Sequence, residues 1–425
     1  AEQVAQALGV ALADSVSRKL AAQPTTNLQA YEAYLHGEQQ LFGKGSYDPP
    51  TLRTAIAHYQ EAVALDSTFS LAWSRLARAT SLLYVNGVPP PALPERALRA
   101  AERTQALAPN TVHGYLAMAA YYRDIRADYA AARRETLKAL ALEPRNPEVV
   151  GGLAGLESAL GQWDSAVVHA REATRLDPRA LVPAERLGNA LRKLGRHREA
   201  RAELDRARAF APAALALLQD RVMVELRDGD MDSARAIFRG ATAVVPAEMV
   251  AHFANSWDLY WVLDDAQQRL LLTLPPESFG DDRASWAIVR AQTHWLRGDS
   301  ALTRAYADSA RLATLEILKV APRDPQRLIL LGLSYAFLGQ RAEAVRHAER
   351  GLALTRGIED QQTTPYYQHL VARIHTLTGA PDQAIDILER LLKVPYEFTP
   401  ASLRIDPNFA PLKGHPRFEK LIAAR

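Results

Sequence analysis

The chain has 425 residues, 48% of them hydrophobic and 23% charged, which excludes disorder along its whole length and provides enough apolar surface for a large core. Lysine and arginine number 51 against 48 aspartate and glutamate, and this near balance excludes the strongly basic surface of a nucleic-acid-binding domain. No cysteine is present, which excludes disulfides, thiolate metal sites and cysteine nucleophiles.

The first 23 residues carry an apolar stripe with a four-residue spacing. The stripe consists of Val4, Leu8, Leu12, Val16 and Leu20. This spacing predicts an amphipathic helix that ends before Pro24. We interpret residues 1–23 as an N-terminal capping helix or as the remnant of an upstream domain.

Prolines recur at a fixed interval through the middle of the chain. A gap of 34 residues separates each of the following from the next: Pro144, Pro178, Pro212 and Pro246. Three equal gaps in succession are poorly explained by chance, and this period predicts the helix–turn–helix unit of a tetratricopeptide repeat. We therefore expect an N-terminal repeat array over residues 24–246.

Small residues and glycines repeat with the same interval. The positions where two helices must approach closely are Ala166, Ala200, Ala234, Ala173, Ala207 and Ala241. Turn glycines, expected to end the first helix of a unit in the left-handed conformation, are Gly161, Gly195 and Gly229. The proline of each unit then stops its second helix.

The pattern weakens and then returns along the rest of the chain. Residues 247–282 have the length of one unit without its small residues or turn glycine, and we expect a degenerate repeat or an inter-array break there. A C-terminal array is expected over residues 283–396 and a C-terminal cap over 397–425. The predicted fold is all-α, a right-handed α-solenoid of about nine or ten tetratricopeptide-like helix pairs.

The two ends of this region carry a more specific resemblance. QPTTNLQAYEAYLHG at 23–37 and LRIDPNFAPLKGHPRFEKLI at 403–422 resemble the ends of a tetratricopeptide module found in larger bacterial signalling proteins. In that family the module follows a serine/threonine kinase, a nucleotide cyclase or a winged-helix regulator. The resemblance covers essentially the whole chain and implies a bacterial sensing or assembly arm.

Motifs that carry catalysis are not found. GKGS at 43–46 lacks the spacing of a phosphate-binding loop and lies in a helical context, so we interpret it as an inter-helix turn. His369 and His375 are six residues apart, which places them on different faces of a helix and argues against a metal pair. We expect no catalytic, cofactor-binding or metal-binding residues.

A partner is expected on the concave face, which the first helix of each pair lines. Counting from the large residue of each first helix gives the candidates Arg78, His113, Arg123, Glu185, Asn189, Arg192, Gln219, Met223, Arg227, Ile329, Leu333 and Phe337. The early positions are polar with excess arginine and the late ones apolar, a mixture that suits an extended peptide or a partner helix. Arg192 and Arg227 are expected to hold acidic groups of one extended partner, and replacing both with Glu to abolish binding without loss of the fold.

The leading hypothesis is a non-catalytic scaffold that binds protein or peptide as the sensing or assembly arm of a larger bacterial signalling protein. The alternative is a free-standing structural subunit that organises a multiprotein complex, and an enzyme is the weakest reading because solenoids lack a closed pocket. Nucleic acid is not an expected partner, whereas self-association is a further candidate. Since no window approaches eighteen apolar residues, we expect a soluble chain, cytoplasmic or an extracytoplasmic arm of a membrane-anchored parent.

Overall fold

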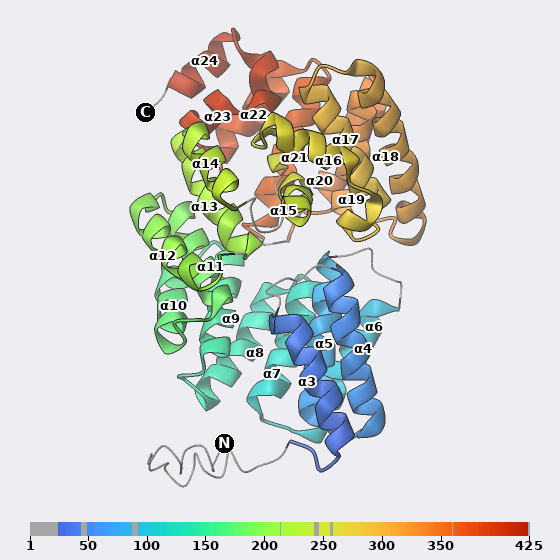
Figure 1. Ribbon diagram of the computed structural model, residues 1–425, viewed down its shortest axis with the longest axis vertical. Coiled ribbons are helices and arrows are strands. Elements are labelled where there is room, and N and C mark those ends of the chain that lie inside the picture. The colour runs from blue at the N-terminus through green and yellow to red at the C-terminus, as the bar shows by residue number, and fades with distance from the viewer. Residues whose placement is uncertain are drawn as a thin grey trace. The chain divides into compact units, whose positions relative to one another are not determined.

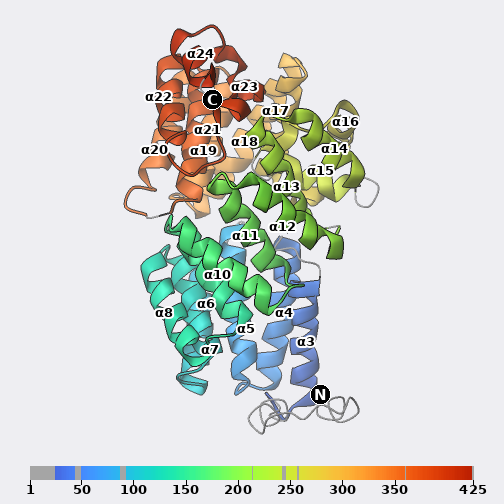
Figure 2. The same cartoon turned by 90° about the vertical axis from the view of Figure 1, so that its left-hand side faces the viewer.

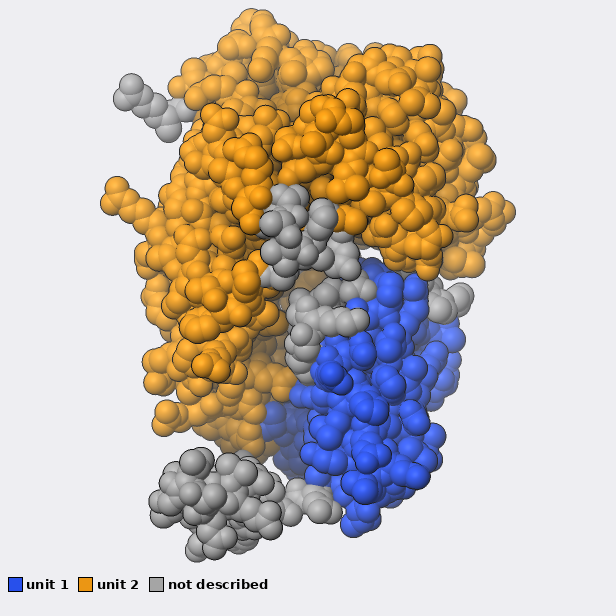
Figure 3. Space-filling view, viewed as in Figure 1, with its two compact units in different colours: residues 1–86, 92–125 blue, residues 87–91, 126–425 orange. Residues whose placement is uncertain are grey.

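The computed structural model describes residues 24–43, 49–86, 92–212, 214–241, 246–255, 258–358 and 360–423. The chain divides into two compact units, the first with residues 1–86 and 92–125 and the second with residues 87–91 and 126–425 (Figure 3). All regular elements within the described ranges are helices, so the all-α solenoid class is confirmed. The expected helix over 1–23 and the GKGS turn fall outside these ranges apart from Gly43, and the expected domain limits stay predictions.

Helices of the first unit pack in consecutive pairs (Figure 1). They are α3 (Leu28–Gly43), α4 (Pro49–Leu65), α5 (Ser70–Asn86), α6 (Leu93–Leu107) and α7 (Val112–Ala120), which continues into the π-helical turn η1 (Tyr121–Ile125). Helix α3 packs against α4, α5 against α6, and α7 packs on α5 and α6. Their shared core contains Tyr34, Tyr59 and Phe69, with the rings of Tyr34 and Phe69 5.2 Å apart.

The second unit continues the same arrangement through more pairs. Its elements are α8 (Tyr129–Leu142), α9 (Pro147–Ala159), α10 (Trp163–Leu176), α11 (Leu181–Lys193), α12 (His197–Phe210), α13 (Leu215–Asp228), α14 (Met231–Ala241), α15 (Pro246–Asn255), η2 (Leu259–Trp261), α16 (Asp265–Thr273), η3 (Pro276–Phe279), α17 (Arg283–Leu296), α18 (Ser300–Val320), α19 (Pro325–Phe337), α20 (Arg341–Ala353), α21 (Thr363–Leu377), α22 (Pro381–Leu391), α23 (Pro400–Ile405), η4 (Pro407–Leu412) and α24 (Pro416–Ala423). Figure 2 shows α10 to α13 following one another side by side. None of the helices in the described ranges combines the length and apolar character needed to cross a membrane.

The predicted helix ends are confirmed at the repeat positions. Helices α8, α10 and α12 end at Leu142, Leu176 and Phe210, shortly before the prolines that were expected to stop them. The turn glycines Gly161, Gly195 and Gly229 have φ values of +74°, +73° and +78°. This left-handed conformation is cheap for glycine and strained for other residues, which explains why each first helix ends where it does.

Small residues bring the helices of a pair close together. Those predicted from the period and described here are buried: Ala166, Ala173, Ala200, Ala207 and Ala234. Gly332 of α19 marks a still closer approach, because a Cβ there would lie 2.7 Å from the Ala344 carbonyl oxygen and 3.0 Å from the Ala348 backbone nitrogen of α20. Helix pairing at this point therefore requires glycine.

Gly332→Ala is expected to lower the free energy of unfolding by about 1–3 kcal/mol, because the added methyl group forces α19 and α20 apart. Gly152→Ala in α9 is the matched control. No heavy atom lies within 4 Å of its added Cβ, so the better helix propensity of alanine should raise the free energy of unfolding by about 0.5–1 kcal/mol. Urea denaturation of both variants measures the difference, and equal effects would contradict the observed pairing.

The least regular part of the second unit lies around α15 and α16. Asp258, just before η2, has φ +55° in the left-handed region, and Asp264 caps α16 through a reciprocal capping box with Gln267. The sharp turn at Asp258 places its own side chain and that of Tyr260 in the interior of the unit, where both are buried. These two residues become part of the site described below.

Contacts distant in sequence close the second unit on itself. The loop between α20 and α21 reaches the ends of α8 and α9, where the Gln361 amide donates to the Ala159 carbonyl at 2.8 Å. The Tyr129 hydroxyl donates to Asp360 at 2.7 Å. After α22 the chain also turns inward, and α23 packs against α13 (Figure 1). Residues 392–399 join α22 to α23, and we call residues 393–399 the strap.

Candidate peptide groove of the second unit

The strap contacts the two first helices α11 and α13, which are neighbours in the stack. Its central residues Tyr396, Glu397 and Phe398 are buried, although residues 393–395 before them are exposed. A non-helical segment buried in this way must find partners for its backbone and for the Glu397 carboxylate. Those partners come from side chains of α11, α13 and α21.

The Glu397 carboxylate is held by two adjacent cations at the end of α11. Arg192 forms an ion pair with one of its oxygens, and Lys193 Nζ lies 2.5 Å from the other. Arg192 is only 2% exposed and also donates from Nη2 to Asp220 Oδ1 of α13 at 2.8 Å. Arg192 thus bridges an acid of the repeat and an acid of the strap.

Arg227, at the end of α13, binds the backbone of the strap. Its Nη1 donates to the Tyr396 carbonyl, and its own carbonyl accepts from the Thr399 hydroxyl at 2.5 Å. The next turn residue is Gly229, where a Cβ would lie 3.1 Å from the Ala401 Cβ, so the chain passes close to the end of α13. The backbone and side chain of Arg227 thus hold the strap at two points, the Tyr396 carbonyl and the Thr399 hydroxyl.

The aromatic residues on either side of Glu397 have their own contacts. Lys193 Nζ lies 4.9 Å from the centroid of the Tyr396 ring, within the range of a cation–π interaction. The Tyr396 hydroxyl is 3.1 Å from Nδ1 of His369 on α21, and the His369 ring packs edge-on against Phe398 with centroids 4.5 Å apart. Side chains of α11 and α21 therefore contact all three of these consecutive strap side chains.

A second buried polar cluster anchors the segment that follows the strap. Arg373 of α21, 1% exposed, pairs with Asp258 at 3.3 Å and donates to the Tyr260 hydroxyl at 3.3 Å and to Gln292 of α17. The Tyr260 hydroxyl in turn donates to Asn408 of η4 at 2.6 Å. The C-terminal cap is tied to the interior through this cluster as well as through apolar packing.

Burial and like charges perturb the cations of the groove. Burial, with the nearby Arg192 and Arg227 charges, holds the pKa of Lys193 well below its usual value. Burial and the Arg192 charge lower the pKa of Arg227 to about 10. The groove therefore contains three basic side chains, Arg192, Lys193 and Arg227, and two carboxylates, Asp220 and Glu397.

Glu185 of α11 is half-buried beside Asp220, and burial together with the Asp220 charge raises its pKa to about 7, an effect that Arg186 opposes. A carboxyl group whose pKa is higher in the folded state than in the unfolded state stabilises the fold at pH values below the unfolded-state pKa. This stabilisation is lost as the pH rises through the folded-state pKa. Compared with Glu185→Gln, the wild-type protein should therefore lose stability between about pH 4.5 and 7. Urea denaturation of both proteins at pH 5 and pH 8 measures this, and a constant difference would contradict it.

No protein-family model matches the chain. Over 73 residues, 17% of its length, it is 40% identical to small glutamine-rich tetratricopeptide repeat-containing protein 2 of Mycosarcoma maydis. The chain spans about a fifth of that relative, since the match covers 21% of it. The match agrees with the 34-residue period and with the consecutive helix pairs. The chain is thus built from helix pairs of the tetratricopeptide type.

Three solved structures similar to this chain have low sequence identity to it. A tetratricopeptide repeat protein from Parabacteroides merdae is 12% identical, with a TM-score of 0.32 over 73% of this chain and 97% of that one. The human IFIT1 dimer with m7Gppp-AAAA is 16% identical, with a TM-score of 0.47 over 84% and 76%. The Cut9–Hcn1 hetero-tetramer of the APC/C is 14% identical, with a TM-score of 0.39 over 92% and 77%.

The structure brings together the predicted partner-binding positions of α11 and α13. Arg192 and Arg227 contact the strap, and Asn189 is hydrogen-bonded to Asp220 beside it. Gln219 accepts a hydrogen bond at 2.9 Å from His252 of α15, and Met223 is buried in the neighbouring core. The burial of both arginines corrects the expectation that replacing them would leave the fold intact.

The other predicted positions lie elsewhere in the repeats. Arg78 of α5, His113 of α7 and Arg123 of η1 belong to the first unit, where Arg123 forms a bidentate pair with its neighbour Asp124 at 2.6 and 2.7 Å. Ile329, Leu333 and Phe337 of α19 are buried in a core cluster that includes Leu370 and Ile374 of α21. The partner role of both groups stays a prediction.

The sequence reasoning missed Lys193, Asp220, His369 and the strap itself. The available signal was the run YEF at 396–398, an acid between two aromatic residues in a non-helical stretch after the last repeat. Such a run is unusual for an exposed linker, because it exposes two large rings. Its binding position was not predictable, since the groove that receives it is built from residues about 200 positions earlier.

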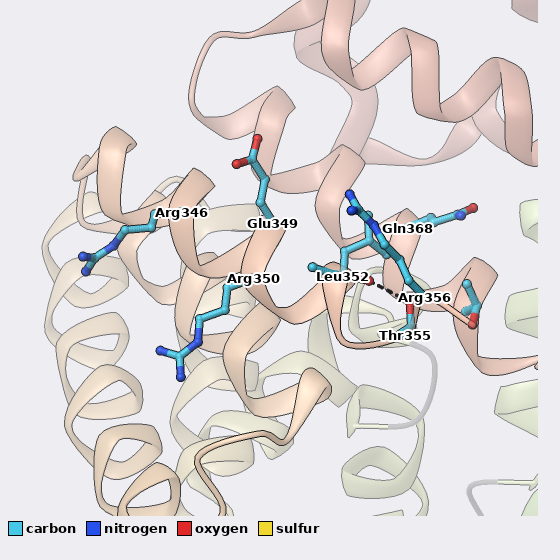
Figure 4. Close-up of a pocket in the computed structure, with 9 residues that line it drawn as sticks. Arg346, Glu349, Arg350, Leu352, Thr355, Arg356 and Gln368 are labelled. Carbon is cyan, nitrogen blue, oxygen red and sulfur yellow. Dashed lines mark hydrogen bonds between the residues drawn. The ribbon is translucent and has the colours of Figure 1, made fainter. Parts of the chain in front are cut away.

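A surface hollow of about 740 Å³ elsewhere in this unit is a weaker candidate. It lies at the end of α20 and the start of α21, with exposed Arg346, Arg350 and Arg356 at its rim (Figure 4). Arg346 pairs with Glu343, Arg350 donates to the Pro322 carbonyl at 3.3 Å, and the Thr355 hydroxyl donates to the Leu352 carbonyl at 2.8 Å. These groups are engaged by their own neighbours, so the strap groove is the better-built site.

Proposed function

We propose that this protein is a non-catalytic scaffold for protein or peptide binding that works through the concave face of its second unit. The observation that carries this proposal is the groove on α11 and α13, which receives a non-helical chain segment through its backbone carbonyl, its carboxylate and its aromatic rings. Arginine contacts to carboxylate and carbonyl groups are the interactions by which such grooves recognise extended peptides. The occupant in this structure belongs to the same chain.

The biological setting that we propose is the sensing or assembly arm of a larger bacterial signalling protein. The end motifs at 23–37 and 403–422 support it through their resemblance to such modules. A free-standing subunit of a multiprotein complex is the alternative. Sequencing the gene upstream of Ala1 separates the two, because the first requires an output domain in the same reading frame.

Site-specific photo-crosslinking in cells tests the scaffold function. A photoreactive amino acid at Asn189, half-buried in α11, should give a covalent adduct with another protein when the cells are irradiated. The same amino acid at the exposed Arg171 of α10 is the matched control. Adducts of equal yield at both positions, or none at Asn189, would contradict groove binding.

A further inference from the structure

The strap meets the groove as a short recognition sequence. Glu397 forms ion pairs with Arg192 and Lys193, and the Tyr396 carbonyl accepts a hydrogen bond from Arg227. The ring of Tyr396 contacts Lys193, and the ring of Phe398 contacts His369. These contacts come from three helices and converge on three consecutive residues. So many contacts to three consecutive residues are typical of a peptide-binding site, where contacts to the backbone provide affinity and contacts to side chains provide specificity.

Charge makes an empty groove unfavourable. Glu397 is the acid of the strap that pairs with both Arg192 and Lys193, and the loss of one partner of a buried ion pair is costly. The groove therefore needs a carboxylate in the position of Glu397. Any occupant that replaces the strap must supply that carboxylate.

The strap is also attached in a way that allows it to leave without taking the cap with it. Residues 393–395 on one side are exposed, whereas the cap beyond the strap is anchored separately by buried Leu403, Phe409 and Phe418. Asn408 adds a hydrogen bond to Tyr260. The strap is thus a loop between two fixed ends, α22 and the cap.

From these observations we propose that the strap is a built-in competitor of an external ligand, and that the ligand is a peptide segment carrying a carboxylate between two aromatic residues. This inference rests on the proposed scaffold function and specifies its ligand. A partner segment with this chemistry takes the place of residues 396–398 on α11 and α13. The partner can then bind the groove only when the strap leaves it.

A fluorescein-labelled peptide of residues 393–402 (KVPYEFTPAS) tests the exchange by fluorescence anisotropy with the full chain. The variant Glu397→Gln weakens the hold on the strap, because a neutral amide replaces the charge that Arg192 and Lys193 bind. We expect this variant to bind the peptide at least about tenfold more tightly than the wild type. Glu316→Gln, on the exposed face of α18, is the matched control and should bind as the wild type does.

A second test changes the glutamate of the peptide and leaves the protein as it is. A peptide with Gln in place of Glu should bind Glu397→Gln at least about tenfold more weakly than the parent peptide. Equal affinities of the two peptides, or no gain from Glu397→Gln, would overturn the proposal. Hydrogen exchange of the wild-type protein with saturating parent peptide provides a test that needs no variant. Exchange at residues 396–399 should rise, and unchanged exchange would overturn the proposal.

The failure of this inference is distinguishable from failure of the scaffold function. If the peptide does not bind but the photo-crosslinker captures a partner at Asn189 and not at Arg171, the scaffold function stands and the ligand chemistry is wrong. If the peptide binds as expected but no adduct forms in cells, the groove chemistry stands and the scaffold function fails.

Discussion

Replacing both Arg192 and Arg227 with Glu is expected to unfold the part of the second unit built on α11 and α13. Arg192 is 2% and Arg227 8% exposed, and they contact Asp220, Glu397 and the Tyr396 carbonyl. Removing one partner of a buried ion pair costs about 3–5 kcal/mol. Two reversals also place new carboxylates beside existing ones, so the loss approaches the whole stability of a typical domain, about 5–15 kcal/mol.

Circular dichroism during urea denaturation measures this loss. The matched control reverses two arginines on exposed faces, Arg171 of α10 and Arg346 of α20, which also form ion pairs with glutamates. Exposed pairs contribute little, so the control should denature close to the wild type. A double groove variant that denatures like this control would show that the two arginines are not buried in solution and that the strap does not cover them.

The repeat architecture was predictable because its signals are local. A proline stops a helix through its own ring and missing N–H, and a glycine ends one through its own φ angle, so Pro178 and Gly195 mark helix ends without knowledge of the rest of the fold. Alanines such as Ala200 and Ala207 report a close approach of helices that are neighbours in sequence. For these features the period alone contains the information.

The arginines of the groove could be predicted from the sequence but the strap that occupies it could not, because the strap lies far from them in the chain. The period correctly placed Arg192 and Arg227 on adjacent first helices, but their partners Glu397 and Tyr396 lie about 200 and 170 residues later. A repeat pattern describes contacts between neighbouring units and says nothing about a segment that returns from the last unit to an earlier one. The two arginines therefore looked like solvated positions on an open surface.

Counting along the first helices also omitted Lys193 and assigned the buried Ile329 to the concave face. Lys193 directly follows Arg192, and successive helical residues point about 100° apart, so only one of them was assigned to the groove. Both reach Glu397 because α11 ends at Lys193 and the strap crosses that end. Ile329 was assigned to the concave face by the same counting, but α21 packs against α19 and Ile329 is fully buried.

The cluster around Arg373 leads to the second large effect. Arg373→Met is expected to lower the free energy of unfolding by about 3–5 kcal/mol, because it leaves Asp258, 5% exposed, without its cation. The Tyr366 hydroxyl, which donates to Asp258 at 2.8 Å, does not neutralise the charge. Arg417→Met in α24 is the control: Arg417 contacts Asp382, Asp386 and Glu389 but is 41% exposed, so its loss should change stability little.

A double variant separates the buried charge from the loss of packing. Asp258→Asn removes the unpaired carboxylate while asparagine still tolerates the left-handed backbone with φ +55°. Arg373→Met with Asp258→Asn should therefore be less destabilised than the sum of the two single variants, with a coupling energy of about 0.5–3 kcal/mol, the range for residues in contact. Urea denaturation of the four proteins gives the cycle. Strict additivity would mean that Arg373 stabilises the cap through Tyr260 and Gln292 and not through its pairing with Asp258.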